Sequence, residues 1–523
     1  FDACLDHFLT NEPMMGIEMA YQLYQQIIPN LPLEAINQFA SQLIKNDNLV
    51  ITLSAPKKDG ETLPTEEELL AMYNNANAME VEPYQEEVFD GPIVPELPKP
   101  GTVKKETTNE TFGTTEWTLS NGMKVIYKQT DFKEDEIRMS AYSPGGLTAL
   151  PQDDPYTLQV LPEIITLGGV GEFSAIDLPK VLAGKKVSVY PQINTYSEGM
   201  TGFSSPKDLE TMMQLIYLYF TAPRADEEAF ASEMQRTKAM LKNMELNPMI
   251  TLSDSLNKVL YNNHPLVKRM TIEDYDKVDY AKAMEMYKDR FSDPNNFTFT
   301  FVGNIDVETF KPLVEQYLAS LKKNKRKENW KNVGLELTNE DYVTHYQREM
   351  KDPKTSVYMI YNGDMEYNLY NQVYMSVLSD VLDIVYTKTI REEQGGTYGV
   401  GVMGSTNNRP DDDFRFLIAF DTNDEVYATL MDIAKAGLRD MAENGPRQED
   451  LSKVLENKLK KRTEQLQENA FWTNAIISNE ADDIDILTEY EEIINGITIE
   501  SLADFTKQIL KGNLKEVVQL PAK

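Results

Sequence analysis

Cysteine and histidine are scarce in this chain of 523 residues. Cys4 is the only cysteine, which excludes a disulfide within the chain and any zinc site built from several cysteines. The three histidines are His7, His264 and His345, and no two of them have the spacing of three or four residues that a helical metal site uses. We therefore expect no zinc site in this chain.

Basic residues and long apolar runs are also under-represented. The chain has 51 lysines and arginines against 84 aspartates and glutamates, which gives a net charge of −33. A nucleic-acid backbone would be repelled, so nucleic acid is not an expected partner, whereas basic peptides would be attracted at low salt. No apolar run reaches the ~20 residues of a membrane span. With 41% hydrophobic residues, the composition is typical of a globular protein.

The first two of four predicted parts are residues 1–60 and the connector 61–112. Helical patterns and a strand at 48–54 fill the first part, which begins inside a helix-like run, so we expect it to be the C-terminal remnant of a preceding domain. Its apolar positions should then remain exposed: Ile17, Leu23, Ile27, Leu33 and Ile36. In the connector, Thr65 can cap a short acidic helix, and four prolines between 89 and 101 predict a semi-rigid extended hinge.

The other two parts, residues 113–325 and 326–523, share one plan. Asn121-Gly122 between two strand-like runs predicts a hairpin near the start of the first of them. Each part mixes strands with helices and ends on a strand. This order predicts an α+β fold with two homologous domains, each a mixed β-sheet backed by helices. The repeated order suggests a distant internal duplication.

Residues 391–402 carry the most distinctive pattern. A helix-like run at 381–390 leads in, and an alternating strand pattern leads out. The turn between them places Arg391 and Tyr398 on one short, rigid corner. Arg391 offers a planar fork of donors for a carboxylate or a peptide carbonyl, and Tyr398 offers a hydroxyl for a developing oxyanion. The residues alone leave open the alternative of an ordinary corner with a surface arginine.

Several motifs together resemble the pitrilysin-type, inverted-motif zinc metallopeptidases, a family that includes insulin-degrading enzyme and presequence protease. Residues 117–125 are similar to the opening strand of the repeated domain, 301–305 to its closing strand, and 469–472 to part of the last repeat. Residues 6–9 and 16–18 are similar to the end of the second repeat. The resemblance implies the C-terminal half of a four-domain enzyme: the tail of domain two, the hinge, and domains three and four.

The zinc motif of that family, H-x-x-E-H, is incomplete here. Residues 160–164 occupy the corresponding place, where Glu163 matches the general base but apolar residues replace both histidines. Residues 240–242 at the third-ligand position have no carboxylate, although Glu245 lies close by. The resemblance therefore implies zinc in an N-terminal half and none in this chain. We interpret Glu163 as a helix-start carboxylate that follows Pro162.

The resemblance also implies a function. In two-half members of the family, an arginine and a tyrosine at this corner face the zinc site across a closed chamber. Arg391 and Tyr398 match that pair as catalytic residues, and Gly395, Gly396 and Thr397 match the substrate-binding turn. The chain is then expected to be the non-zinc-binding half of a metalloendopeptidase that encloses unfolded or short peptides. Alone it should be inactive, and its expected partners are the zinc-binding half and the peptide.

Two alternatives remain from other functional classes. One is a catalytically inert scaffold or subunit that supports an active partner, which the missing histidines favour and the retained Arg391/Tyr398 pair disfavours. The other is a peptide-binding module without hydrolysis. The paucity of cysteine fits a bacterial periplasm or cell envelope as well as a cytoplasm, so the sequence leaves the compartment unknown.

Overall fold

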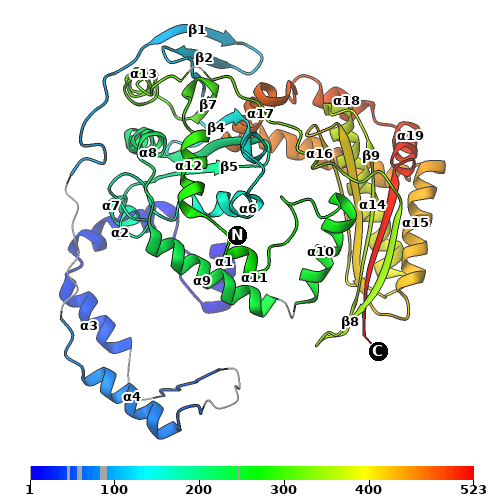
Figure 1. Cartoon of the computed structure of the whole chain (residues 1–523), viewed down its shortest axis with the longest axis horizontal. Coiled ribbons are helices and arrows are strands. Elements are labelled where there is room, and N and C mark those ends of the chain that lie inside the picture. The colour runs from blue at the N-terminus through cyan, green and yellow to red at the C-terminus, as the bar shows by residue number, and fades with distance from the viewer. Residues whose placement is uncertain are drawn as a thin grey trace. The chain divides into compact units, whose positions relative to one another are not determined.

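The computed structural model describes residues 2–43, 48–55, 62–82, 91–244, 247–324 and 326–522. The chain divides into two compact units, Phe1–Glu87 and Val88–Lys523. Figure 1 shows both units, coloured from the N-terminus to the C-terminus. Among the described residues, no helix combines the length and apolar character that crossing a membrane requires.

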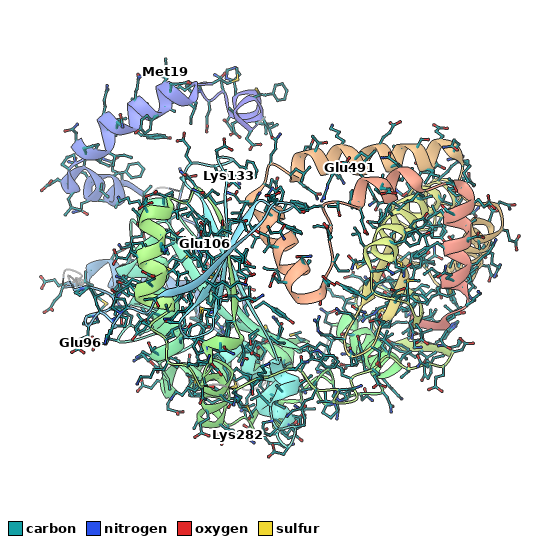
Figure 2. The ribbon with its side chains drawn as sticks, turned by 90° about the horizontal axis from the view of Figure 1, so that it is seen from above. Met19, Glu96, Glu106, Lys133, Lys282 and Glu491 are labelled. Carbon is teal, nitrogen blue, oxygen red and sulfur yellow. The ribbon has the colours of Figure 1, made fainter. Side chains whose placement is uncertain are left out.

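The first unit consists of helices, and none of them buries a residue. The helices are α1 (Asp2–Thr10), α2 (Ile17–Ile27), α3 (Leu33–Leu43) and α4 (Glu66–Ala78). The expectation of exposed apolar positions is confirmed, because the exposed fractions of the five predicted side chains run from 38% to 78%. Met19 of α2, labelled in Figure 2, is 63% exposed as well.

Two local predictions in this unit have different outcomes. Thr65 caps α4 in a reciprocal box with Glu68, in which the Glu68 amide donates to Thr65 Oγ1 at 3.2 Å and the Thr65 amide donates to Glu68 Oε2 at 2.8 Å. The predicted strand at 48–54 is wrong, because the described residues 48–55 form no strand. An apolar extended segment becomes a strand only when a neighbouring strand accepts its backbone hydrogen bonds.

The second unit contains two mixed sheets, as predicted for the fold class. The first has seven strands in the order β1-β2-β3-β7-β4-β6-β5, and only the β3–β7 pair is parallel. Its strands are β1 (Val103–Asn109), β2 (Thr114–Leu119), β3 (Lys124–Gln129), β4 (Ile137–Pro144), β5 (Val187–Ile193), β6 (Ser197–Ser204) and β7 (Thr298–Gly303). The predicted hairpin at Asn121-Gly122 is confirmed: it joins β2 to β3, with Gly122 at φ +92°.

One face of this sheet is covered by helices that share its hydrophobic core. They are α5 (Gly146–Ala149), α6 (Pro155–Ile164), α7 (Leu178–Val181), α8 (Leu209–Thr221), α9 (Glu227–Met244), α11 (Ile272–Tyr275), α12 (Tyr280–Arg290) and α13 (Val307–Leu313). The core extends into the range predicted as a connector, because Ile93 and Val94 are buried in it and β1 pairs along β2.

The second sheet has five strands in the order β10-β11-β9-β12-β8, with only β8 and β12 parallel. Its strands are β8 (Tyr342–Arg348), β9 (Thr355–Asp364), β10 (Val400–Asn407), β11 (Asp413–Thr422) and β12 (Asn513–Pro521). Its helices are α14 (Leu369–Tyr386), α15 (Tyr427–Asn444), α16 (Gln448–Gln465), α18 (Tyr490–Gly496) and α19 (Ile499–Leu510). Read in reverse, the strand order is β8-β12-β9-β11-β10, and its parallel and antiparallel pairs match those of β3-β7-β4-β6-β5 in the first sheet. The predicted repeat of one plan is therefore confirmed in strand topology.

The two sheets exchange a helix. α17 (Asn469–Asp482), from the second half of the sequence, packs on β4 and β7 of the first sheet, where Ala475 and Ile476 are buried with Ile126 and Val302. In return, α10 (Pro248–Tyr261) packs on β12 of the second sheet. Figure 1 shows α17 beside β4 and β7, and α10 beside the second sheet. This exchange explains why both sheets fall in one compact unit.

The exchange also accounts for one boundary that differs from prediction. A single helix at 447–477 is expected from the sequence pattern, but α16 ends at Gln465 and α17 begins at Asn469. Asn469 is 1% exposed, and its side chain accepts from Thr130 Oγ1 at 2.5 Å and donates to Glu136 Oε1 at 3.1 Å. These contacts turn the chain out of α16 and onto the first sheet.

Candidate functional site

The corner that carries Arg391 and Tyr398 begins at a well-anchored helix end. α14 ends at Tyr386, and one π-helical turn follows at Thr387–Glu392. Tyr386 and Ile390 are fully buried. The Tyr386 hydroxyl donates to the Ala434 carbonyl at 2.8 Å, and burial raises the pKa of this phenol, which keeps its proton in place for that bond. The backbone that presents Arg391 is therefore held against the core.

Gly395 and Gly396 make the turn that follows, each for its own reason. Gly395 has φ +64°, a left-handed conformation that glycine adopts without strain, and its amide donates to the Arg391 carbonyl at 3.1 Å. Gly396 lies close to α15, because a Cβ atom there would be 3.2 Å from Cδ1 of Leu430. Its carbonyl accepts a hydrogen bond of 2.6 Å from Oγ1 of Thr422, a contact that no pattern in the sequence indicates.

Thr397 closes the turn and leads into the strand. Its hydroxyl donates to the Gly399 carbonyl at 2.9 Å and accepts from the Gly399 amide at 3.2 Å. β10 starts at Val400, which is buried, and it lies at the edge of the sheet with β11 as its neighbour. The five predicted residues therefore lie on one short segment that is fixed at both ends.

Arg391 and Tyr398 flank this turn with their side chains in solvent. Tyr398 is fully exposed, at 100% of its possible area, and Arg391 is exposed as well. Within the described part of the chain, neither side chain makes a hydrogen bond or an ion pair. A guanidinium with five donors and a phenol with one hydroxyl are thus both available to a molecule that approaches the corner.

The corresponding corner of the first sheet has a different character. β5 occupies the edge position there, and a left-handed Gly184 precedes it, as Gly395 precedes β10. The two cationic side chains at that corner bind within the protein: Lys185 donates to Thr211 Oγ1 at 3.2 Å, and Lys186 forms an ion pair with Asp135. In one repeat the corner is thus tied down by its own side chains, and in the other it is left open.

Comparison with known proteins identifies the family of this region. Residues 277–458 match the model for the peptidase M16 inactive domain. This segment is similar to that domain. The resemblance to the pitrilysin-type peptidases is therefore confirmed.

Relatives of the M16 domain extend the match over nearly the whole chain. It is 28% identical over 497 residues to an Arabidopsis thaliana protein named zinc protease PQQL-like, with 91% of this chain and 49% of that protein covered. It is 23% identical over 518 residues to the probable zinc protease PqqL of Escherichia coli, with 96% of this chain and 54% of that protein covered. The chain spans about half the length of these relatives.

Solved structures confirm the fold. The periplasmic protease PqqL from Escherichia coli superposes with a TM-score of 0.74 at 20% identity, over 100% of this chain and 58% of that one. A peptidase M16 inactive domain from Pseudomonas fluorescens superposes with a TM-score of 0.62 at 14% identity, over 78% of this chain and 98% of that one.

The positions that would bind zinc in an active M16 domain do not fit a metal here. Val160 and Ile164 are buried apolar residues of α6, and Glu163 is exposed. α6 starts at Pro155 with Asp154 as its cap, so Pro162 and Glu163 lie in its last turn. The interpretation of Glu163 as a helix-start carboxylate is therefore wrong.

The remaining candidate ligands are dispersed. Met240 at the third-ligand position is 54% exposed and has no metal-binding oxygen, and Glu245 lies outside the described residues. His264 follows α10, where its Nε2 contacts the Val333 carbonyl at 3.0 Å, and His345 lies in β8. In the described ranges, no three histidine, cysteine, aspartate or glutamate side chains gather as a metal site would require.

Proposed function

We propose that this chain is the non-zinc-binding half of a zinc metalloendopeptidase that encloses unfolded or short peptides in a chamber. The observation that carries the proposal is the M16 inactive domain, in a chain related to zinc-protease-named proteins over about half of their length. The zinc then belongs to a partner half, either in the same polypeptide or in a separate subunit. There it would activate water for attack on the peptide carbonyl.

Arg391 and Tyr398 are the residues we propose for substrate and transition-state binding. The Tyr398 hydroxyl would donate to the oxygen on which negative charge develops, an interaction that acts mainly in the transition state. The Arg391 fork would orient a peptide carbonyl or carboxylate. Gly395, Gly396 and Thr397 would fix the path of the backbone between the two. Neither side chain has a partner among the described residues, on a corner that is otherwise fixed, and this supports these roles.

Steady-state kinetics on the complete, two-half protein tests the proposal. Tyr398→Phe keeps the ring and removes the donor, so kcat should fall by roughly 10²–10³-fold with little change in KM. Arg391→Lys keeps the charge and loses the fork, so KM should rise as well. Tyr370→Phe is the matched control, because Tyr370 is an exposed tyrosine at the far end of α14.

Wild-type kcat in Tyr398→Phe would end the catalytic assignment. A complete protein without peptidase activity, in which the chain still binds its partner half, would instead favour the inert scaffold. The solved relative from Escherichia coli is a periplasmic protease. We propose the same compartment for this chain, with a cytoplasmic location as the alternative that fractionation would reveal.

A further inference from the structure

A cavity of about 370 Å³ lies on the helical side of the second sheet, apart from the Arg391/Tyr398 corner. α14 and α16 form its two long walls, and the start of α17 and α18 close it. The volume falls within the ~300–1,000 Å³ of small-molecule pockets. α17 enters here through Phe471, which belongs to the segment 469–472 singled out in the sequence.

One wall of this cavity is cationic, which is unusual in a chain with a net charge of −33. Lys458, Lys461 and Arg462 line it from a single helix, α16. Lys458 already has an internal partner, because its Nζ lies 2.8 Å from Asp380 and donates to Ser376 Oγ at 2.7 Å. Lys461 is exposed and has no such partner among the described residues. The carboxylates of Asp485 and Glu491 act electrostatically on Arg462 and offset part of its charge, so Lys461 supplies most of the uncompensated charge at this wall.

Arg462 is the most strongly held of the three. Its side chain lies between two aromatic rings, with the guanidinium carbon 4.5 Å from the Phe471 centroid and 4.7 Å from the Tyr490 centroid. The residue is 4% exposed, and burial lowers the pKa of the guanidinium from its usual value. One nitrogen donates to the Ile486 carbonyl, and no other described residue accepts from the remaining donors. A dehydrated, pre-oriented cation of this kind favours a carboxylate.

The rest of the lining is mixed, because Gln372, Ser376 and Gln465 contribute polar groups to it. Its apolar part is larger: Leu369 and Val373 of α14 are buried where they line the cavity, and Ile486 and the two rings add to this surface. The cavity therefore presents the Lys461 and Arg462 cations beside an apolar surface. Such a set suits a single carboxylate on an apolar body better than a polyphosphate, which would need more charge and less apolar surface.

We propose that this cavity binds the C-terminal residue of a peptide, with the carboxylate at Lys461 and Arg462 and an apolar side chain on the floor between α14 and α16. The peptide character of the ligand rests on the proposed function. The site would hold the end of a substrate or of a cleaved product, away from the corner that acts on the scissile bond.

Isothermal titration calorimetry on the full chain tests the site without the zinc-binding half. N-acetyl-L-leucine is the probe, and N-acetyl-L-leucinamide, acetate and inorganic phosphate are the comparison ligands. The carboxylate should bind at least about 10-fold more tightly than the amide, as expected for a charge-assisted contact. Acetate and phosphate should each bind at least about 10-fold more weakly than the probe, because neither fills the floor.

Two lysines on one helix provide the variant and its control. Lys461→Gln should weaken binding of N-acetyl-L-leucine about 3- to 5-fold, the range for one partly exposed charge pair. Lys460→Gln changes the neighbouring exposed lysine, which does not line the cavity, and should leave the affinity unchanged.

Equal binding of the acid and the amide, or no heat of binding at 10 mM probe, would overturn the proposal. Equal effects of the two lysine variants would also overturn it, because they would place the anion outside the cavity. Phosphate binding as tight as that of N-acetyl-L-leucine would show a general anion site instead. These outcomes differ from failure of the proposed function, which is decided by the kinetics of Tyr398→Phe.

Discussion

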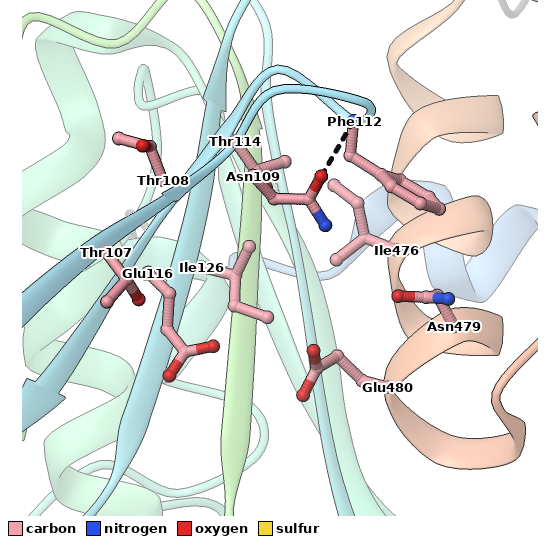
Figure 3. A pocket seen from close by; sticks show the side chains of 10 residues that line it. All are labelled: Thr107, Thr108, Asn109, Phe112, Thr114, Glu116, Ile126, Ile476, Asn479 and Glu480. Atoms are coloured by element: carbon pink, nitrogen blue, oxygen red, sulfur yellow. Dashed lines mark hydrogen bonds between the residues drawn. The ribbon is translucent and has the colours of Figure 1, made fainter. Parts of the chain in front are cut away.

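Docking of α17 on the first sheet should contribute measurably to stability, and Ile476→Ala tests it. Ile476 is 3% exposed and shares a buried cluster with Phe112, Ile126 and Val302. Figure 3 shows Ile476 and Phe112 side by side at a small cavity of about 70 Å³ between the β1–β2 hairpin and α17. The substitution removes three carbon atoms at this place. At ~0.8 kcal/mol for each, the lost transfer free energy is about 2.4 kcal/mol.

The cavity beside Ile476 limits any further cost. Truncation enlarges a space whose rim is polar, with the Glu116 and Glu480 carboxylates and the Asn109 amide, so water can enter it (Figure 3). The additional penalty of an empty apolar void should therefore be small. We expect the free energy of unfolding to fall by about 2–3 kcal/mol, at the lower end of the range for buried isoleucine truncations.

Urea unfolding followed by tryptophan fluorescence measures this change, because Trp472 lies on α17 itself, with Lys128 Nζ 3.9 Å from its ring. The midpoint should fall without a change in the slope of free energy against urea. Ile176→Ala is the matched control at a position that is 75% exposed, and it should change stability by less than about 0.5 kcal/mol. If Ile476→Ala behaves like the control, α17 does not anchor the second half of the chain to the first sheet.

Three further predictions concern pH, metal and the corner. Burial raises the pKa of Glu198 to about 7 from its usual 4.5, so between pH 5 and 7 the folded state binds a proton that the unfolded state has lost. The free energy of unfolding should therefore fall as the pH rises through this range and level off above it. Glu198→Gln should remove this dependence of the melting temperature on pH. The purified chain should contain less than stoichiometric zinc by elemental analysis, and a chelator should leave its melting temperature unchanged, whereas a bound, fold-supporting zinc would contradict the expectation. Tyr398→Phe and Arg391→Lys should each alter stability by less than about 0.5 kcal/mol, because both side chains lie in solvent, and a clear loss in a thermal melt would favour a structural role.

Features set by neighbouring residues could be predicted from the sequence. The Asn121-Gly122 hairpin and the Thr65 cap depend on a few adjacent residues, and both are present. The end of α16 could not be predicted, because the contacts of Asn469 with Thr130 and Glu136 lie more than 330 positions away in the sequence. The strand expected at 48–54 failed for a related reason, since a strand depends on a partner that local apolarity does not supply.

The same distinction applies to the candidate site. Residue types and spacing single out Arg391, Tyr398 and the glycines between them as the proposed site, because a helix, a turn and a strand are local. The residues that surround this corner could not be predicted from local sequence. Thr422, for example, donates to the Gly396 carbonyl from another strand, 26 positions away. The cationic cavity was missed altogether, because its opposite wall, α14, is far from α16 in the sequence and meets it only in the fold.

The charge of the chain makes the open corner informative. Acidic residues exceed basic ones by 33, so the chain has more potential acceptors than cations to pair with them. Glu392 and Glu393 directly follow Arg391, yet neither forms an ion pair with it in the described structure. At the equivalent corner of the first sheet, Lys186 is paired with Asp135. An arginine that remains unpaired amid surplus carboxylates, on a backbone held by Ile390 and Gly396, has the arrangement expected of the substrate-binding residue that we propose.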